Sequence, residues 1–503
     1  MKKSKHDSLY NEIDNDTINV LNAAYSTWIN ASQLRAVRQR NKNFTYGNQW
    51  GDLVKSKDGR RIPESQLIEE SGKEPLANNL IRQLVKSVVG RFRTTVMAKR
   101  DKTSNYMIDS DTKPQTSETE PMPDLLAKAY EDNILDELDS RGLEEFLISG
   151  CCVQKVSLKR RLNKNGIRVD NININHFFTN AIKDARAWDC EIIGELHDMS
   201  ISELIMRLAD GNRERAAWLR SIYSTNIGNR IINTQSIIGA NNEKGADFWH
   251  TNSGKCRVIE VWTLESREII ECHDYAYGTY YIADNATLPE IEAQNAMRSK
   301  TNTPVIDTQW DIEEMWHCRW ISPMGDLLKE YDSPYNHHSH PYALKMYPLT
   351  DGEIHSFVED IIDQQKYINR LITLVDHIMG ASAKGVLLFP TDALPDGFTW
   401  EDIKRTWSSS NGIIPFEAGR SLLPQQISTN ATNIGAYELL SLQMKLFEEI
   451  SGVSGALQGK TAGNGTGAQL YDHQAENSAI ALADIFETFN SFRKLRDNLI
   501  TNI

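Results

Sequence analysis

The chain has 503 residues, which is too long for one hydrophobic core and predicts roughly two to four domains. It has the composition of a globular protein, with 40% hydrophobic and 24% charged residues, and its 68 acidic and 55 basic residues give a formal net charge of −13. A protein that binds nucleic acid tightly by neutralising phosphates normally has more basic than acidic residues. The charge therefore argues against tight DNA binding, but not against a surface past which DNA slides.

Membrane spans, a secretory signal and disulfides are not expected. No apolar run approaches the roughly 18 residues of a membrane span, and the basic first residues lead into polar sequence rather than a signal-peptide core. We therefore expect the chain to stay in the cytoplasm after synthesis. The cysteines lack C-x-x-C spacing, which favours free thiols over a disulfide framework or a zinc ribbon. They are Cys151, Cys152, Cys190, Cys256, Cys272 and Cys318.

The first 150 residues are predicted to be mainly helical. Apolar residues at helical spacing predict helices over residues 16–41, 78–92 and 125–148, the second of them ending near Gly90. Residues 104–124 are polar and proline-containing without periodicity, so we expect an exposed loop there. A basic cluster ends the first helix; it either faces phosphates or, as we favour, forms a solvated helix face. Its members are Arg35, Arg38, Arg40 and Lys42.

Strands are predicted between residues 152 and 350. Alternating polarity predicts a hairpin over residues 152–174 with its turn at Asn165-Gly166. Basic residues at its tip either touch nucleic acid or, as we favour, prevent edge-to-edge aggregation. A capping box at Ser200 to Glu203 opens a helix that runs on through Leu219. Further strand patterns lie at residues 257–264, 275–283 and 315–321.

The longest regular pattern predicts a helix over residues 354–379, between a turn signal at residues 350–352 and Gly380. A rod of this length measures roughly 39 Å, well above the average globular helix. One face is apolar and is expected to pack: Ile354, Val358, Ile361, Ile362, Ile368, Leu371, Ile372, Val375 and Met379. A polar stripe follows the other side in steps of three and four: Glu359, Asp363, Lys366, Arg370, Thr373 and His377.

Shorter elements follow this helix. The sequence predicts strands over 385–389 and 412–416, a short helix over 400–407 and a strong helix over 435–450. A glycine-rich loop from Ser451 to Gly467 then opens a last helix. The chain stops inside that helix, so we expect no long helical extension beyond it.

The sequence contains only weak matches to nucleotide-binding, metal-binding or catalytic motifs. Gly459-Lys460-Thr461 lacks the earlier glycine and the preceding strand of a phosphate-binding loop, so no nucleotide or other cofactor is expected. His337, His338 and His340 lie near Asp332, but adjacent histidines on an extended segment point in different directions, and we expect loop histidines rather than metal ligands. No hydrolase, metalloprotease or calcium-loop motif occurs. We therefore expect no enzyme and no catalytic or metal site.

Several stretches of the chain resemble the podovirus-type portal proteins of tailed bacteriophages, and they occur in the same order as in those proteins. The segment Gly47-x-Gln49-Trp50 resembles a motif near the start of many portals, and Asn78 begins a similar apolar helix. The long helix carries Asp363-x-Gln365 and a downstream Asn369, followed by the short strand at 385–389. Residues 176–195 and the glycine-rich loop at 451–468 are also similar to portal stretches.

The resemblance implies an α+β, portal-type fold with long stem helices, a mixed α/β wing, a β-rich clip and a helical crown. On this basis we expect a wing and N-terminal body over residues 1–254, a clip-like segment over 255–350 and a stem helix over 351–380. A wing return over 381–433 and crown-directed helices over 434–503 would follow.

The family implies a structural protein of the virion, assembled in the host cytoplasm. It forms a ring, usually a dodecamer, at one capsid vertex, through which double-stranded DNA is packaged and ejected without sequence recognition. Terminase, capsid and scaffolding proteins, and tail or adaptor proteins are the implied partners, and no membrane is involved. The polar stripe from Glu359 to His377 either lines the channel, with the apolar face on neighbouring subunits, or meets solvent outside the ring.

Two other interpretations remain. The first is a metal-dependent nucleic-acid-processing enzyme of the packaging machinery that uses the cluster at His337 to His340 with acidic partners. The second is a monomeric interaction protein without a channel. A metal requirement would favour the first and the absence of a large assembly the second.

Overall fold

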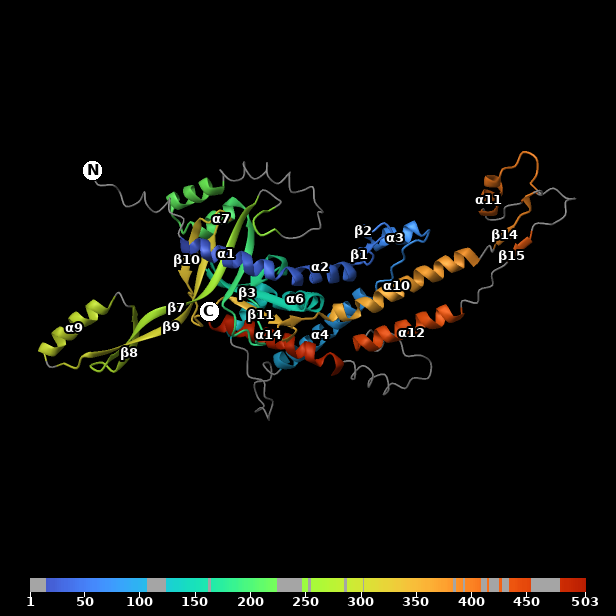
Figure 1. Cartoon of the computed structure of the whole chain (residues 1–503). Coiled ribbons are helices and arrows are strands. Elements are labelled where there is room, and N and C mark those ends of the chain that lie inside the picture. Colours follow the sequence, from blue (N-terminus) through green and yellow to red (C-terminus); the bar gives the residue numbers. More distant parts are fainter. Residues whose placement is uncertain are drawn as a thin grey trace. The chain divides into compact units, whose positions relative to one another are not determined.

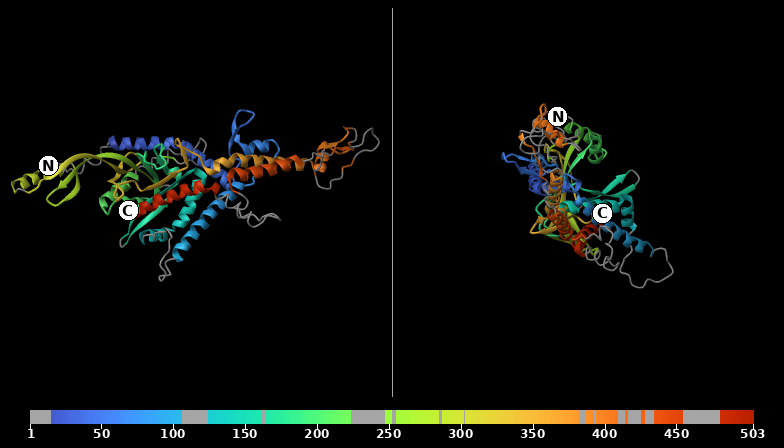
Figure 2. Two further views of the ribbon diagram at one scale, coloured as in Figure 1. Left: turned by 90° about the horizontal axis from the view of Figure 1, so that it is seen from below. Right: turned by 90° about the vertical axis from the view of Figure 1, so that its right-hand side faces the viewer.

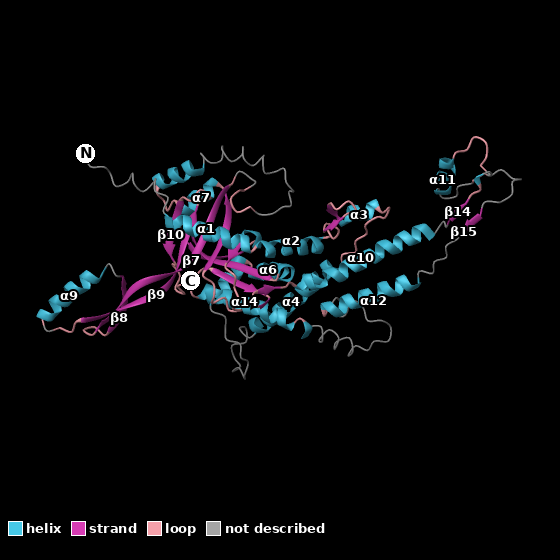
Figure 3. Cartoon of the chain, viewed as in Figure 1, coloured by secondary structure: helices cyan, strands magenta, loops and turns pink. Residues whose placement is uncertain are grey.

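The computed structural model describes most of the chain, and its helices and sheets are mixed, as the predicted α+β class requires (Figure 1 and Figure 3). All strand pairs among the described residues are antiparallel. The described residues are 15–105, 124–161, 164–223, 247–251, 255–284, 287–301, 303–382, 386–391, 394–408, 414–415, 425–427, 434–453 and 480–503. Residues 106–123 of the predicted loop at 104–124 and most of the glycine-rich loop lie outside these ranges, whereas residues 104–105 end α4 and residue 124 begins α5.

The chain forms two compact units. Unit 1 comprises residues 1–39, 86–359 and 479–503, and unit 2 comprises residues 40–85 and 360–478. Residues 255–350 therefore belong to the same unit as residues 86–254. The finer segment boundaries inferred from the portal resemblance stay predictions.

Unit 1 contains a six-stranded sheet in the order β10-β9-β7-β6-β5, with β8 paired to β7. Its strands are β5 (Phe177–Thr179), β6 (Ile192–Met199), β7 (Cys256–Asp274), β8 (Thr279–Asp284), β9 (Ile306–Ile321) and β10 (Leu327–Asp332). Strands lie at the predicted places, but β8 begins only at Thr279, after a turn over residues 275–278, and β7 and β9 are far longer than their patterns suggested. Beyond β6 and β10 they continue as a ribbon that carries β8 and α9 (Leu288–Lys300) (Figure 1).

A second, three-stranded sheet has the order β11-β3-β4. The predicted hairpin is confirmed, but its turn is not at Asn165-Gly166. These two residues lie within β4 (Lys164–Asn171), opposite Arg160 and Lys159 of β3 (Cys151–Arg161). The backbone pairing extends to Arg161 with Lys164. Strand β11 (Tyr342–Met346) pairs with the other edge of β3.

The two sheets are the middle layers of four. The main core lies between them and contains Val153, Trp262 and Tyr342 among its buried residues. Helix α1 (Asn15–Asn30) covers the outer face of the six-stranded sheet through Leu21 and Ala24. Helices α5 (Asp124–Asn133), α6 (Leu135–Ser149) and α14 (Ala483–Thr501) cover the outer face of the three-stranded sheet.

Helix α14 is fixed in this layer by a buried arginine. Arg496 is fully buried and pairs with Asp139 of α6, and it also donates to the hydroxyl of Tyr130 on α5 at 2.7 Å. Arg493 reaches the same Asp139 carboxylate at 2.7 Å. The charges compensate one another, which is the condition for keeping an arginine in a core.

Helix boundaries differ from the sequence prediction at three places in unit 1. The predicted first helix is two helices, α1 and α2 (Ser32–Tyr46), and the helix over 125–148 is broken at Ile134, which has a left-handed φ of 51°. Helix α7 (Ile201–Leu208) begins at the predicted Ser200 cap but is interrupted before residue 213, because Asp210 and Gly211 adopt positive φ angles, and residues 213–223 are helical again. The six cysteines are buried free thiols, as predicted.

Unit 2 is built around α10 (Phe357–Ser382), the long predicted helix. It begins three residues later than expected, because the Ser356 hydroxyl accepts the Glu359 N–H and caps it, whereas Ile354 lies in β13 (Glu353–Ile354). Helix α4 (Leu80–Asn105) also continues past Gly90, where a side chain would meet open space. In Figure 2, α10 lies beside α12 (Ile434–Ser451).

The remaining elements of unit 2 are short. They are β1 (Leu53–Lys55), β2 (Arg61–Pro63), α3 (Glu64–Glu70), β14 (Val386–Leu388), α11 (Trp400–Ser408) and β15 (Gln425–Ile427). Strand β14 pairs with β15. The strand predicted at 412–416 is not observed at its two described residues, Ile414 and Pro415.

The close approach of β6 to β7 depends on Gly194. A Cβ there would lie 2.3 Å from the carbonyl oxygen of Glu260 and 2.4 Å from the ring of Phe178. We expect Gly194→Ala to lower the free energy of unfolding by about 3 kcal/mol, through overpacking. Urea denaturation measures the change. The control is Gly166→Ala, whose Cβ meets nothing within 4 Å, and equal stability of the two variants would contradict the interpretation.

Candidate functional site

One side of α10 carries a ladder of buried polar side chains. Gln365, Asn369 and Thr373 are spaced by four residues and are at most 4% exposed. They bind the extended segment before α4, where backbone groups have no strand partner. The Gln365 Oε1 accepts the Leu80 N–H at 3.1 Å, and the Thr373 hydroxyl accepts the Leu76 N–H at 3.1 Å.

The ladder also holds the loop that follows α2. Asn369 donates to Gln49 Oε1 at 2.6 Å and accepts the Asn78 N–H at 3.1 Å. Gln49 in turn donates to the Phe44 carbonyl at 2.9 Å and to Asn79 Oδ1 at 3.1 Å. The polar groups of this buried region thus satisfy one another, as burial requires.

A group of charges lies beside the ladder. Lys366 Nζ is 2.8 Å from Asp52, and Arg370 donates to Glu64 at 2.5 Å. Arg40 completes the group with a 3.0 Å contact to Asp52. Burial raises the pKa of Asp52, but the hydrogen bonds and charges of Arg40 and Lys366 outweigh it and leave the pKa below its ordinary value. The predicted basic cluster is therefore not simply a solvated face, because Arg38 is also buried and pairs with Glu145.

The predicted polar stripe is not one exposed surface of the single chain. Thr373 lies in the interior, which corrects its expected exposure, and Lys366 is mostly enclosed by its ion pairs. Asp363 and His377 are exposed, Arg370 is half-exposed, and Glu359 is partly buried. Whether the exposed members line a channel stays a prediction.

The apolar face of α10 is largely buried within one chain. Val358, Ile361, Ile362, Ile368, Leu371 and Val375 are all under 9% exposed. Met379 is the clear exception at 50% exposure. Of this apolar face, at most the last turn of α10 therefore stays available to pack on a neighbouring subunit.

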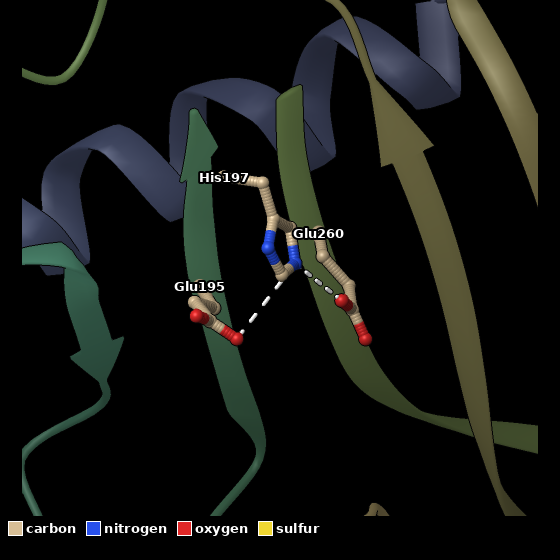
Figure 4. Close-up of side chains that lie close together, drawn as sticks. All are labelled: Glu195, His197 and Glu260. Atoms are coloured by element: carbon tan, nitrogen blue, oxygen red, sulfur yellow. Dashed lines mark hydrogen bonds and ion pairs between the residues drawn. The ribbon is translucent and has the colours of Figure 1, made fainter. Parts of the chain in front are cut away.

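A second cluster joins the two sheets of unit 1, and Figure 4 shows its three residues on the six-stranded sheet, Glu195, His197 and Glu260. Glu195 and His197 project from β6 and Glu260 from β7, and Lys155 of β3 reaches the same place. The His197 Nε2 is 2.7 Å from Glu260, and its ring stacks on Trp320. Glu260 also accepts the Trp262 indole N–H at 2.8 Å.

In this cluster the charge of Lys155 balances the buried Glu260 carboxylate without a metal ion. Burial raises the pKa of Glu260, yet the charge of Lys155 and the hydrogen bond from His197 hold it well below its ordinary range. Burial lowers the pKa of Lys155, and Glu260 and Glu195 more than restore it. The ligand atoms of Glu195, His197 and Glu260 lie within 4.8 Å of one another, but the Lys155 ammonium occupies the cation's role. We assign the cluster to joining the two sheets.

The histidines considered as metal ligands are engaged in their own loop. His337 Nδ1 accepts the Ser339 N–H at 3.1 Å, and His340 Nδ1 accepts the Tyr342 N–H at 3.2 Å. Among the described residues, these histidines belong to no group of three metal-ligand side chains. Within those residues, no helix is long and apolar enough to cross a membrane.

The family model of the phage P22-like portal protein matches residues 23–499 of the chain. No match to a curated protein was found. The chain is thus a structural component of a phage capsid, concerned with DNA packaging. It belongs to the phage P22-like portal protein family, and the resemblance noted from its sequence is confirmed.

The ladder explains why short portal-like motifs far apart in the sequence occur together. Gln49, Asn78, Gln365 and Asn369 were singled out by resemblance, and all four meet in one hydrogen-bonded group. Periodicity alone missed this group, because amides at the edge of an apolar face look like ordinary surface residues. The spacing of Gln365, Asn369 and Thr373 by four was the available signal.

Asn369→Ala removes three hydrogen bonds at once and leaves the buried Gln49 oxygen without this donor. We expect it to lower the free energy of unfolding by about 3 kcal/mol. Chemical denaturation of the full chain measures the effect. Asp363→Ala, an exposed change on the same helix, is the control and should alter stability by less than about 0.5 kcal/mol.

The structure also predicts a pH dependence. Burial lowers the pKa of His340 from 6.5 to about 4, so between these values the unfolded chain binds a proton that the native chain does not. The contribution of this group to stability is therefore full above pH 6.5 and falls as the pH drops towards 4, by about 3 kcal/mol.

Denaturation at several pH values tests this dependence. Because His176 and His337 also have lowered pKa values, the comparison is with His340→Asn, which should flatten the dependence between pH 4 and 6.5. An unchanged slope in that variant would refute the assignment.

Proposed function

We propose that the chain is the subunit of a ring at one capsid vertex, usually a dodecamer in this family, which conducts double-stranded DNA during packaging and ejection. The observation that carries the proposal is the family match across residues 23–499. The same role makes the ring a docking site for terminase and for tail or adaptor proteins, with capsid and scaffolding proteins around it. The mechanism is passive, since terminase supplies the work.

The charge of the chain supports a conduit rather than a DNA-binding protein. A net charge of −13 repels phosphates and prevents DNA from sticking to a wall. The exposed part of the α10 stripe, Asp363, Arg370 and His377, is the part that we propose to face the channel. The open alternative is that it meets solvent on the outside of the ring.

Two segments are candidates for the protruding end that meets terminase. The first is the ribbon of β7 and β9, inside the predicted clip-like segment 255–350. The second is the segment with β14, α11 and β15, which lies between α10 and α12 in the sequence. These two helices lie side by side in Figure 2, and the Tyr437 hydroxyl contacts the Met379 sulfur at 3.3 Å. Deleting each segment and measuring terminase binding to assembled rings distinguishes them.

The mass of the purified full-length protein tests the ring. We expect an assembly many times the 57.1 kDa of one chain, with a central hole in negative stain. A chain that stays monomeric at high concentration, and also when it is co-expressed with its capsid and scaffolding proteins, would contradict the proposal.

Asp363→Lys tests the channel lining. A ring of added positive charges in the channel should attract phosphates, slow packaging and make its rate depend more steeply on salt, while ring assembly stays intact. The control is Glu69→Lys, the same charge reversal at an exposed residue of α3. Lys366 and Arg370 are unsuitable, because their loss would remove both cations that pair with the buried Glu64. Unchanged packaging by intact Asp363→Lys rings would place this face outside.

A further inference from the structure

Half of β9 has an open edge. Strand β9 pairs with β7 along Ile306–Ile321, but on its other side β10 pairs only with His317–Ile321. Within the part of the chain that the structure describes, no strand lies along the other side of residues 306–316. An open edge presents a row of backbone donors and acceptors to solvent.

Both ends of this edge are closed by local hydrogen bonds. At Ile306 the side chain of Asn295 accepts the N–H at 2.7 Å and donates to the carbonyl at 2.8 Å. At Trp316 the carbonyl accepts the Ser333 N–H at 2.9 Å. Because N–H and C=O of one residue point to the same side and alternate along an antiparallel strand, the outward-facing residues between these ends are Thr308, Trp310, Ile312 and Glu314.

The outward groups and the side chains around them suit a partner strand. The Ile312 N–H is bound by the neighbouring Asp311 side chain at 2.8 Å, which a competing strand can displace, and the other outward groups of residues 308–314 face solvent. Trp310 and Ile312 are 56% and 52% exposed on one face of the ribbon. Two large apolar side chains two residues apart are the pattern that an added strand covers.

The charge around the edge identifies the chemistry of the partner. Between Glu265 and Glu314 the chain carries eleven acidic and three basic residues. One of the three, Arg298, is already bound to Asp274 at 2.6 Å. A second copy of this ribbon would bring an equally acidic surface and be repelled. A segment with lysine or arginine is attracted instead.

We propose that the outer edge of β9 at residues 308–314 binds an extended, basic segment of another protein as an added β-strand. Main-chain hydrogen bonds supply the affinity, Trp310 and Ile312 receive apolar side chains, and the acidic residues select a basic partner. The opposite edge of the ribbon, β8, is shorter and is the weaker template. The proposal goes beyond the conduit role and does not require the chain to form a ring.

The test uses the full-length protein and a labelled nine-residue peptide that alternates lysine and valine. We expect saturable binding that weakens with salt, and at least tenfold weaker binding of the same peptide with N-methylated alternate amides. Ile312→Pro removes an outward N–H and should weaken binding at least tenfold, since proline is tolerated on an edge where its nitrogen faces solvent. Asp311→Asn combined with Glu314→Gln, which leaves the backbone unchanged, should weaken binding at least threefold.

The matched control is Ile282→Pro on β8. Ile282 is 59% exposed, and the alternation along β8 points its N–H away from β7, so this change alters the opposite edge and should leave binding intact. Equal binding by Ile312→Pro and the unaltered protein, equal binding of the N-methylated peptide, or no saturable binding would overturn the proposal. Self-association without peptide that Ile312→Pro abolishes and Ile282→Pro does not would assign the edge to a second copy, and would also overturn it.

Discussion

Unit 2 depends on one requirement: the backbone N–H groups of Leu76, Asn78, Leu80 and Ile81, in the extended segment before α4 and at the start of that helix, need partners that no strand supplies. The chain meets it with neutral amides and a hydroxyl from three successive turns of one helix, Gln365, Asn369 and Thr373. Amides suit this role because each both donates and accepts, so a few of them can satisfy several backbone groups without a buried net charge. The charged residues Lys366 and Arg370 are placed one residue further round the helix, where carboxylates neutralise them.

Unit 1 also contains buried polar side chains, but these are charged residues rather than neutral amides. Two sheets face each other across an apolar core, and Lys155 of β3 meets two glutamates of the opposite sheet, one of which also binds His197. Removing Lys155 would leave the buried Glu260 carboxylate without its ammonium partner, which costs more than the pair contributes. The arrangement makes the stacking of the sheets specific. It also accounts for a His/Glu cluster that otherwise looks like a metal centre.

The sequence predicted most elements, because their periodicity is strong: α10, α12, the hairpin of β3 and β4, and the free cysteines. Its errors concern local rules that tertiary contacts override. Asn165-Gly166 stays inside a strand, Gly90 stays inside a helix, and Ile134 breaks a pattern that looked continuous. Periodicity did not predict the amide ladder or the ionic group, since each joins residues about 300 positions apart and a single sequence does not record contacts of that separation. Family resemblance found the ladder's residues without showing that they touch.

The packing of α14 has a consequence for the order in which the protein is made. Its buried residues, Phe489, Phe492, Arg496 and Ile500, complete a layer whose other members come from residues 124–171. On a ribosome the earlier helices and the three-stranded sheet emerge first, with Asp139 lacking the arginines that neutralise it. Unit 1 therefore reaches its native state only after α14 has been translated. Such a topology delays the surfaces that unit 1 presents until α14 is in place.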